Sequence, residues 1–285
     1  CKSIGRTQGR AAWVIGLSLS IGAGSACAQI SQVRAELSQT RFVPLQSYVH
    51  GEVEDDLLFF CGLSGMGFHS RARDGRITFP AEAFNRDVFL FDPESQTTRS
   101  ASTLTLPRPL RHYLVATNAQ AIQVDGFLYI YGGYGPVPET VSWTTWDSVI
   151  KIDLAAVRHA ILNSLDLPES AFTLYHSRAA QVDGGAIVSV GRYFALVGGS
   201  KFGGNYADEA NFSNVYPEQI HIFDPNLSFT QPVRTYSDPQ YRRRDGNVTA
   251  ITLGESGNQR PGFIVHIGGF KPGNEVLPEM WEHPI

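Results

Sequence analysis

The feature that most constrains this chain is an apolar run ending in glycine, which recurs four times at nearly equal spacing. The last three runs end in double glycines that stand 66 and 70 residues apart, at Gly132-Gly133, Gly198-Gly199 and Gly268-Gly269. The first run ends differently, in Cys61-Gly62-Leu63-Ser64-Gly65, with Gly65 lying 67 residues before Gly132. Regular spacing of this kind predicts a repeat architecture in which each copy is one structural unit.

Each copy shares further strand-like parts around its glycines. A strand-like stretch precedes the glycine run at 113–124, 179–190 and 248–253. After the run come a loop and an apolar strand that ends in aspartate, at Asp92, Asp153 and Asp224. Proline follows the first and third of these, and Asp-Pro is typical of turns, while paired glycines permit positive φ or close backbone approach. With 28 Gly and 11% aromatic residues, this order predicts an all-β chain whose units each contain four strands.

The combination of apolar-Gly-Gly and Asp-Pro resembles the kelch repeat, and the resemblance covers roughly residues 45–285. It implies a kelch-type β-propeller of four-stranded antiparallel blades, with about three and a half blades in this chain. The copies depart from the kelch pattern in their longer period and in Phe229, which stands where the third copy should have tryptophan. Because a propeller must close its ring, we interpret the chain as a C-terminally truncated piece of a larger propeller. A four-bladed ring completed by residues 30–45 is the alternative.

One insertion between strands has a helical pattern. Asp153 is a suitable N-cap for a helix over 154–165, in which four apolar residues from Leu154 to Leu165 share one face. We expect this helix to pack on the outside of the second unit rather than to bind a partner.

The first 28 residues have the composition of an export signal. Lys2, Arg6 and Arg10 precede an uncharged, largely apolar stretch that ends in Ala26-Cys27-Ala28. This order predicts a signal peptide over 1–28, a mature domain over 29–285 and an exported protein, periplasmic or extracellular. The apolar run over 13–28 has 16 residues, fewer than the ~20 that cross a bilayer, so no transmembrane span is expected in the mature chain.

The three cysteines refine this picture. Gly24-Ser25-Ala26-Cys27 loosely resembles a lipobox, so a lipid anchor through Cys27 is the less favoured variant. Cys1 and Cys27 lie in the predicted leader, which leaves Cys61 as the single mature cysteine. An exported domain with one cysteine has no internal disulfide and depends on its apolar core.

Charge and motif content argue against several classes of protein. The chain has 23 Lys+Arg against 27 Asp+Glu, a net charge of −4, and no basic run, which argues against nucleic-acid binding. It contains no GxSxG, HExxH, Walker or dinucleotide-binding motif, and its histidines lack zinc-site spacing. We therefore predict no cofactor and no metal.

Polar clusters open the strands that precede the glycine runs, and in kelch blades that strand is the innermost one. The resemblance implies that such residues gather at the mouth of the central channel. The candidate ligand-binding residues are Arg111, His112, His176, Arg178, Arg243 and Asp245. A ring of guanidinium and imidazole groups suits a carboxylate, sulfate or phosphate, because arginine offers paired donors in a fixed fork. The alternative is that these residues make hydrogen bonds and ion pairs between blades, with Asp245 held by a neighbouring arginine.

We therefore expect an exported binding or interaction module. Its ligand at the channel mouth is a carbohydrate or anionic small molecule, or else it binds a protein partner. The alternative is a carbohydrate-active enzyme such as the sialic-acid mutarotase of the kelch class, since the candidate set contains acid/base groups and carboxylate-binding arginines. The sequence leaves open whether the chain is an enzyme.

Overall fold

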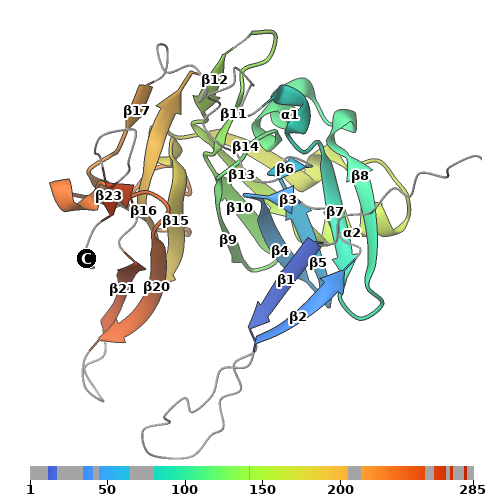
Figure 1. Ribbon diagram of the computed structural model, residues 1–285, viewed down its shortest axis with the longest axis horizontal. Helices are drawn as coiled ribbons and strands as arrows, with labels where there is room; N and C mark the ends of the chain where they lie inside the picture. Colours follow the sequence, from blue (N-terminus) through green and yellow to red (C-terminus); the bar gives the residue numbers. More distant parts are fainter. Residues whose placement is uncertain are drawn as a thin grey trace, which may run out of the picture.

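The computed structural model has an all-β architecture in which every described strand pairing is antiparallel (Figure 1). It describes residues 12–17, 35–40, 45–64, 80–140, 142–204, 213–253, 260–267, 270–271 and 279–280. Three successive parts of the chain each form a four-stranded arrangement whose strands pair in chain order. The predicted all-β class and the predicted four-strand order of the units are thereby confirmed.

The three sheets have closely similar make-up. The first contains β4 (Val49–Val53), β5 (Asp56–Phe60), β7 (Asp87–Asp92) and β8 (Thr97–Ser102). The second contains β9 (Gln120–Val124), β10 (Phe127–Tyr131), β13 (Ser148–Asp153) and β14 (Phe172–His176). The third contains β15 (Asp183–Val190), β16 (Tyr193–Gly203), β18 (Gln219–Phe223) and β19 (Arg234–Ser237). Asp92 and Asp153 are the last residues of β7 and β13, and Asp224 directly follows β18, as predicted.

Shorter pairings complete the strand list. β3 (Leu45–Gln46) pairs with β6 (Leu63–Ser64), and β11 (Tyr134–Pro136) forms a hairpin with β12 (Trp143–Thr145). The long strand β16 continues past its sheet to pair with β12 and with β17 (Ser213–Val215). The remaining pairs are β20 (Asn247–Leu253) with β21 (Arg260–Ile267), β22 (Phe270–Lys271) with β23 (Glu279–Met280), and β1 (Ala12–Leu17) with β2 (Ala35–Thr40).

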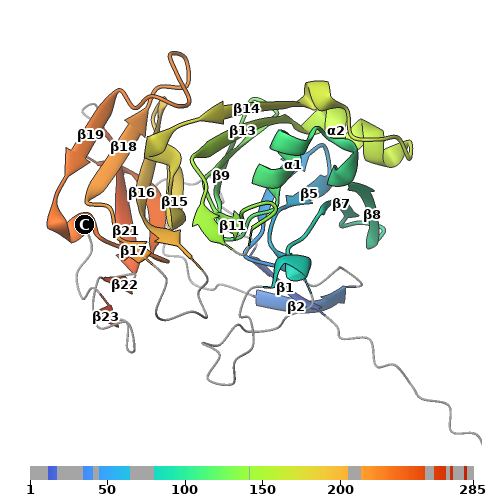
Figure 2. The same ribbon diagram turned by 90° about the horizontal axis from the view of Figure 1, so that it is seen from above.

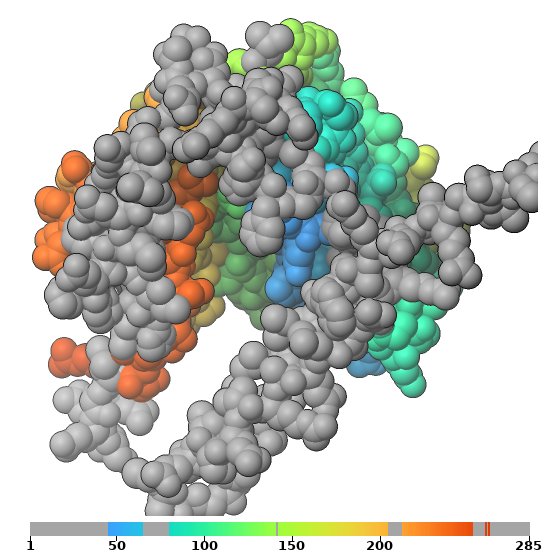
Figure 3. Space-filling view, in the orientation of Figure 1, coloured from blue at the N-terminus to red at the C-terminus, as the bar shows by residue number. Residues whose placement is uncertain are grey.

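The sheets follow one another along an arc, with their first strands side by side (Figure 2). β4 contacts β9, β9 contacts β15, and β15 contacts β20. The space-filling view places the blue-to-green first two sheets on one side and the orange segments of the later part of the chain on the other (Figure 3). Apolar side chains fill the layers between neighbours: Tyr131 of the second sheet and Phe223 of the third are fully buried, with ring centroids 5.7 Å apart.

The glycine corners join each sheet to the next. The Gly133 N–H donates to the carbonyl of Val182 at 2.9 Å, and the Gly199 N–H donates to the carbonyl of Arg243 at 2.6 Å. Gly132 has φ +59°, and a Cβ there would lie 2.3 Å from the Val182 oxygen. Only glycine fits such an approach without displacing backbone, which explains the repeated pair.

The first unit builds the same corner from Cys61-Gly62. The Gly62 N–H donates to the carbonyl of Ala116 at 2.7 Å, and Cys61 has φ +60° where the other units have a glycine. The spacing pairs Gly65 with Gly132, whereas the structure places Cys61-Gly62 at the position of Gly132-Gly133. Gly65, Gly268 and Gly269 lie outside the described residues. Burial raises the pKa of the Cys61 thiol to about 12, so this cysteine is an inert part of the core.

The helix predicted after Asp153 is present and is slightly shorter than expected. In α2 (Leu154–Leu162) the Asp153 carboxylate accepts a hydrogen bond from the Ala156 N–H at 3.0 Å, and the apolar face from Leu154 to Ile161 is buried. Leu165 falls outside the helix and is 54% exposed. α2 contacts β4 and β8 of the first sheet as well as β13 of the second, so it covers two units rather than the second alone.

A second helix replaces part of a predicted strand. The stretch 113–124 was expected to be extended, but α1 (Arg108–Leu114) occupies its start and β9 begins only at Gln120. Leu110 and Leu114, four residues apart, are buried in the core between the first two sheets, which favours the helical turn. Among the described residues, five short 3₁₀ helices connect other strands: η1 (Ala81–Ala83), η2 (Thr103–Thr105), η3 (Glu169–Ala171), η4 (Arg178–Ala180) and η5 (Pro239–Tyr241).

Of the predicted leader, the structure describes only the strand Ala12–Leu17, which pairs with Ala35–Thr40. Cys27 and the predicted cleavage point lie outside the described residues. None of the helices among the described residues is long and apolar enough to cross a membrane.

Candidate functional site

A pocket of about 470 Å³ lies beside α1, which we call the α1 pocket. Its walls come from three places: the segment from η1 to η2 of the first sheet, α1 itself, and the tip of the β11–β12 hairpin. Its charged and polar lining includes Arg86, Arg108, Arg111, His112 and Glu139. Leu104, Val115 and 136–138 add an apolar wall. A pocket of this volume with one apolar side and a few polar groups has the dimensions of a small-molecule site.

Arginine outnumbers carboxylate in the α1 pocket. Arg108 forms an ion pair with Glu139, whereas Arg111 donates only to the carbonyl of Leu104, at a long 3.4 Å. Arg86 likewise donates to the carbonyl of Ala81 at 3.4 Å. Within the part of the chain that the structure describes, no carboxylate pairs with Arg86 or Arg111. Their guanidinium groups therefore have donors left for a ligand anion.

His112 shares this pocket and is held in its neutral form. Partial burial lowers the pKa of His112 below its usual range, and the positive charges of Arg108, Arg111 and Arg86 lower it further, against a smaller opposing effect of Glu139. At neutral pH the imidazole can donate one hydrogen bond and accept another.

The other predicted site residues lie elsewhere. His176, the last residue of β14, has its Nδ1 3.2 Å from a carboxylate oxygen of Asp147, and its ring meets the edge of Tyr113 at a centroid distance of 5.4 Å. Arg178 on η4 lines a cleft of only about 20 Å³ together with Lys201 and His221. That cleft has room for about one water molecule.

Arg243 and Asp245 are used in joining sheets. Arg243 is 3% exposed, its Nε donates to the carbonyl of Gln240 at 2.9 Å, and burial lowers its pKa. The Asp245 carboxylate lies 3.5 Å from the Arg244 Nε, as the alternative of an aspartate held by a neighbouring arginine predicts. Of the six candidate residues, Arg111 and His112 line the α1 pocket together, and the other four are not among its lining residues.

A buried polar cluster near Asp245 escaped the sequence interpretation. Asp183 is fully buried at the start of β15, and its carboxylate accepts hydrogen bonds from Thr145 Oγ1 at 2.8 Å and Ser200 Oγ at 3.2 Å. Arg244 pairs with it at 3.0 Å. Burial raises the pKa of Asp183, and Arg244 opposes that rise. Because every oxygen of the carboxylate is occupied, we interpret the cluster as a joint between the third sheet and the segment before β20.

The segments at the starts of β4, β9, β15 and β20 are also linked to one another. Ser47, Asn118, Gly184 and Asp245 all have φ between +53° and +60°. The N–H of each later residue donates to the carbonyl of the previous one, at 3.2, 2.9 and 2.7 Å in chain order. In the first three units this residue at positive φ lies 15 positions before the second residue of the glycine corner, which is Gly62, Gly133 or Gly199. A residue type that tolerates positive φ at this spacing is therefore the sequence signal for these hydrogen bonds.

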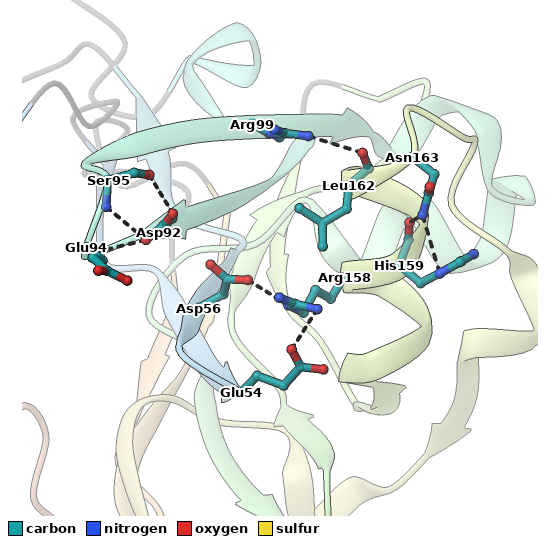
Figure 4. Close-up of polar contacts among 10 residues, drawn as sticks. All are labelled: Glu54, Asp56, Asp92, Glu94, Ser95, Arg99, Arg158, His159, Leu162 and Asn163. Carbon is teal, nitrogen blue, oxygen red and sulfur yellow. Dashed lines mark hydrogen bonds and ion pairs between the residues drawn. The ribbon is translucent and has the colours of Figure 1, made fainter.

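A smaller depression of about 240 Å³, which we call the α2 groove, lies at the opposite end of the first sheet (Figure 4). It is lined by the β4–β5 and β7–β8 turns and by α2. Here Arg158 of α2 is bracketed by Asp56, with Nε–Oδ2 2.6 Å, and by Glu54, with Nη1–Oε2 2.9 Å. Arg99 donates to the carbonyl of Leu162 at 3.1 Å.

Comparison with known proteins supports the fold alone. No family model matches the chain, and no curated protein sequence matches it. Among solved structures it is similar to YjhT, with 16% sequence identity and a TM-score of 0.51. The match covers 84% of this chain and 66% of the YjhT chain, so the chain spans slightly less than two thirds of that protein.

Proposed function

We propose that this chain is a kelch-type β-propeller module that binds a small anionic ligand, such as an acidic carbohydrate, in the α1 pocket. Three features support the propeller: strands that pair in chain order in three units, first strands in mutual contact, and glycine corners that join neighbours. They agree with the kelch resemblance of the glycine and Asp-Pro motifs.

The observation that carries the binding proposal is the surplus of arginine in the α1 pocket. Arg86, Arg108 and Arg111 face a single carboxylate, Glu139, and His112 is neutral at pH 7. The charged lining therefore favours a carboxylate, sulfate or phosphate group. The apolar wall beside it suits the carbon skeleton of a sugar or similar ligand.

Calorimetric titration with sodium glucuronate, glucose and sodium sulfate tests this proposal. We expect glucuronate and sulfate to bind and glucose not to bind, because only the first two carry an anion. Arg111→Ala should weaken glucuronate binding about tenfold, the loss of one charge-assisted hydrogen-bonding partner. Arg99→Ala is the matched control, since Arg99 also contacts one backbone carbonyl but lies outside the pocket. Equal weakening by both variants would exclude the α1 pocket as the site.

The mutarotase alternative has one observation in its favour. A neutral imidazole can accept the proton of the anomeric hydroxyl as the bond between C1 and the ring oxygen breaks, and it can deliver that proton to the ring oxygen. The reverse transfers close the open-chain aldehyde to the other anomer, and His112 is neutral in a pocket that also contains arginine. NMR exchange between the anomers of glucuronate measures this activity directly. Acceleration by the wild type that His112→Asn abolishes, with binding retained, would favour the enzyme, and no acceleration would favour a binding module.

We also propose that the protein is exported, because residues 1–28 have the composition of a signal peptide. If residues 1–28 are a signal peptide, the N-terminus of the exported protein will be Gln29. Mass spectrometry of the mature protein distinguishes that product from a lipidated Cys27 and from an unprocessed chain.

A further inference from the structure

The tip of the β11–β12 hairpin brings an acidic residue across the mouth of the α1 pocket. Pro136 pairs with Trp143 at the end of the hairpin, and within the tip the Val137 N–H donates to the carbonyl of Ser142 at 2.8 Å. At the apex, Glu139 has φ +61° and forms an ion pair with Arg108 of α1. The two residues are 31 positions apart in the chain, and both line the pocket.

This ion pair imitates the contact that the proposed ligand would make. A carboxylate on a guanidinium group is the chemistry expected of an acidic ligand at Arg86, Arg108 or Arg111. Of these three arginines, Arg108 alone has a carboxylate partner among the described residues. Glu139 therefore competes for one of the positions that a ligand anion would use.

We propose that Glu139 is an internal counter-ion of the α1 pocket and sets its ligand selectivity. This inference rests on the proposed function. A ligand anion displaces Glu139 from Arg108, and the displaced carboxylate then accepts hydrogen bonds from water or from the ligand. A hydroxylated acid offers such donors beside Glu139, whereas sulfate has none to offer and its two negative charges repel Glu139. The pocket accordingly selects an acid that carries hydroxyl groups, such as a sugar acid, over sulfate.

The exposure of the pair makes such displacement feasible. The side chains of Arg108 and Glu139 are 53% and 76% exposed, so water and salt screen their attraction. The pair of Asp183 and Arg244, with exposures of 0% and 16%, is the opposite case, because breaking it would leave a buried charge. Only the exposed pair can open at a small free-energy cost.

Titration of the wild type and three variants with sulfate and glucuronate tests the inference. Glu139→Gln should bind sulfate about threefold to tenfold more tightly than the wild type, because the competing charge is gone. The affinity of Glu139→Gln for glucuronate should rise less, because the hydroxyl groups of glucuronate lose the charged Glu139 carboxylate as a hydrogen-bond acceptor. Glu139→Asp keeps the charge but is one methylene shorter, so it should also gain sulfate affinity by losing its reach to Arg108. Glu94→Gln is the control for net charge, because Glu94 is exposed at the α2 groove.

The outcomes separate this inference from the proposed function. Sulfate affinities that are equal in Glu139→Gln and Glu94→Gln would overturn the counter-ion while leaving the pocket intact. If sulfate affinity rises in Glu139→Gln but not in Glu139→Asp, the rise comes from the net charge and not from the contact with Arg108. That result would also overturn the role of Glu139 as a counter-ion. If neither wild type nor variants bind sulfate or glucuronate, the proposed function fails, and the counter-ion fails with it.

Discussion

The α1 pocket and the α2 groove lie at opposite ends of the first sheet and use the same residue types for different purposes. In the α2 groove Arg158 contacts two carboxylates, and Asp92 is held by the hydroxyl and N–H of Ser95, which lower its pKa. In the α1 pocket three arginines face one carboxylate. Carboxylates outnumber arginines in the groove, whereas arginines outnumber carboxylates in the pocket.

The difference separates a structural joint from a binding site. Asp56 is 7% exposed, and its contact with Arg158 ties α2 to the β4–β5 turn over 102 residues of chain. A folded protein gains nothing by leaving Arg86 and Arg111 with only long contacts to carbonyl groups. We infer that the groove, where Arg158 is paired with two carboxylates, stabilises the fold, and that the pocket, where arginines lack carboxylate partners, serves a ligand.

The largest effect expected from this comparison is that of Arg158→Ala on stability. Removing the guanidinium leaves the Asp56 carboxylate nine-tenths buried without its charged partner, so the free energy of unfolding should fall by about 2 kcal/mol. Urea denaturation measures this loss. Arg111→Ala should change the same quantity by less than about 0.5 kcal/mol, because its one hydrogen bond is long. Equal losses in both variants would remove the distinction between the two regions.

Salt should act on the two regions unequally. Salt ions screen the attraction between a ligand anion and the exposed arginines of the α1 pocket. The affinity for glucuronate should therefore fall roughly threefold to tenfold between 50 and 500 mM sodium chloride. The stability difference between wild type and Arg158→Ala should change little over the same range, because the contact with Asp56 is largely buried. Calorimetry and urea denaturation at both salt concentrations make this comparison. A salt-independent glucuronate affinity would contradict a site built from exposed arginines.

Much of the fold was predictable because local rules determine it. The strand order, the turn after Asp92 and the N-cap at Asp153 depend on neighbouring residues only. The extended start expected at residue 113 was wrong, because burial of Leu110 and Leu114 between two sheets favours a helix there. The corner at Cys61-Gly62 was misaligned because a non-glycine residue at positive φ leaves no mark in a glycine pattern.

The site was less predictable because its parts come from different units. Arg111 and His112 were named from their position before a glycine run, and both line the α1 pocket. Arg86 and Glu139 were not named, since they reach it from the first sheet and from a hairpin tip. Radial repetition suggested that Arg243 joins the same ring, but the Arg243 side chain is buried against the carbonyl of Gln240. Contacts between units depend on packing that a single sequence does not display.

The smallest expected effect is a pH dependence that arises at His112. Burial and the neighbouring arginines lower its pKa in the folded protein from the usual 6.5. The neutral imidazole therefore stabilises the fold above pH 6.5, and this contribution is lost as the pH falls through the lower, folded pKa. A bound anion acts in the opposite direction, because its negative charge favours the imidazolium. Sulfate remains a dianion in this range, so its affinity should rise roughly twofold to fourfold from pH 7.5 to 5.5, with proton uptake.

Calorimetry in two buffers of different ionisation enthalpy counts the protons taken up as sulfate binds. The wild type should take up protons near pH 6 and few at pH 7.5, whereas His112→Asn should take up almost none at either pH. Glu139 also faces the imidazole and raises its pKa. The same experiment on the double variant that combines His112→Asn with Glu139→Gln separates the effect of Glu139 from that of His112. Proton uptake that persists unchanged in His112→Asn would place the titrating group outside the α1 pocket. The surplus of arginine at α1 would then no longer be the feature that distinguishes the two ends of the first sheet.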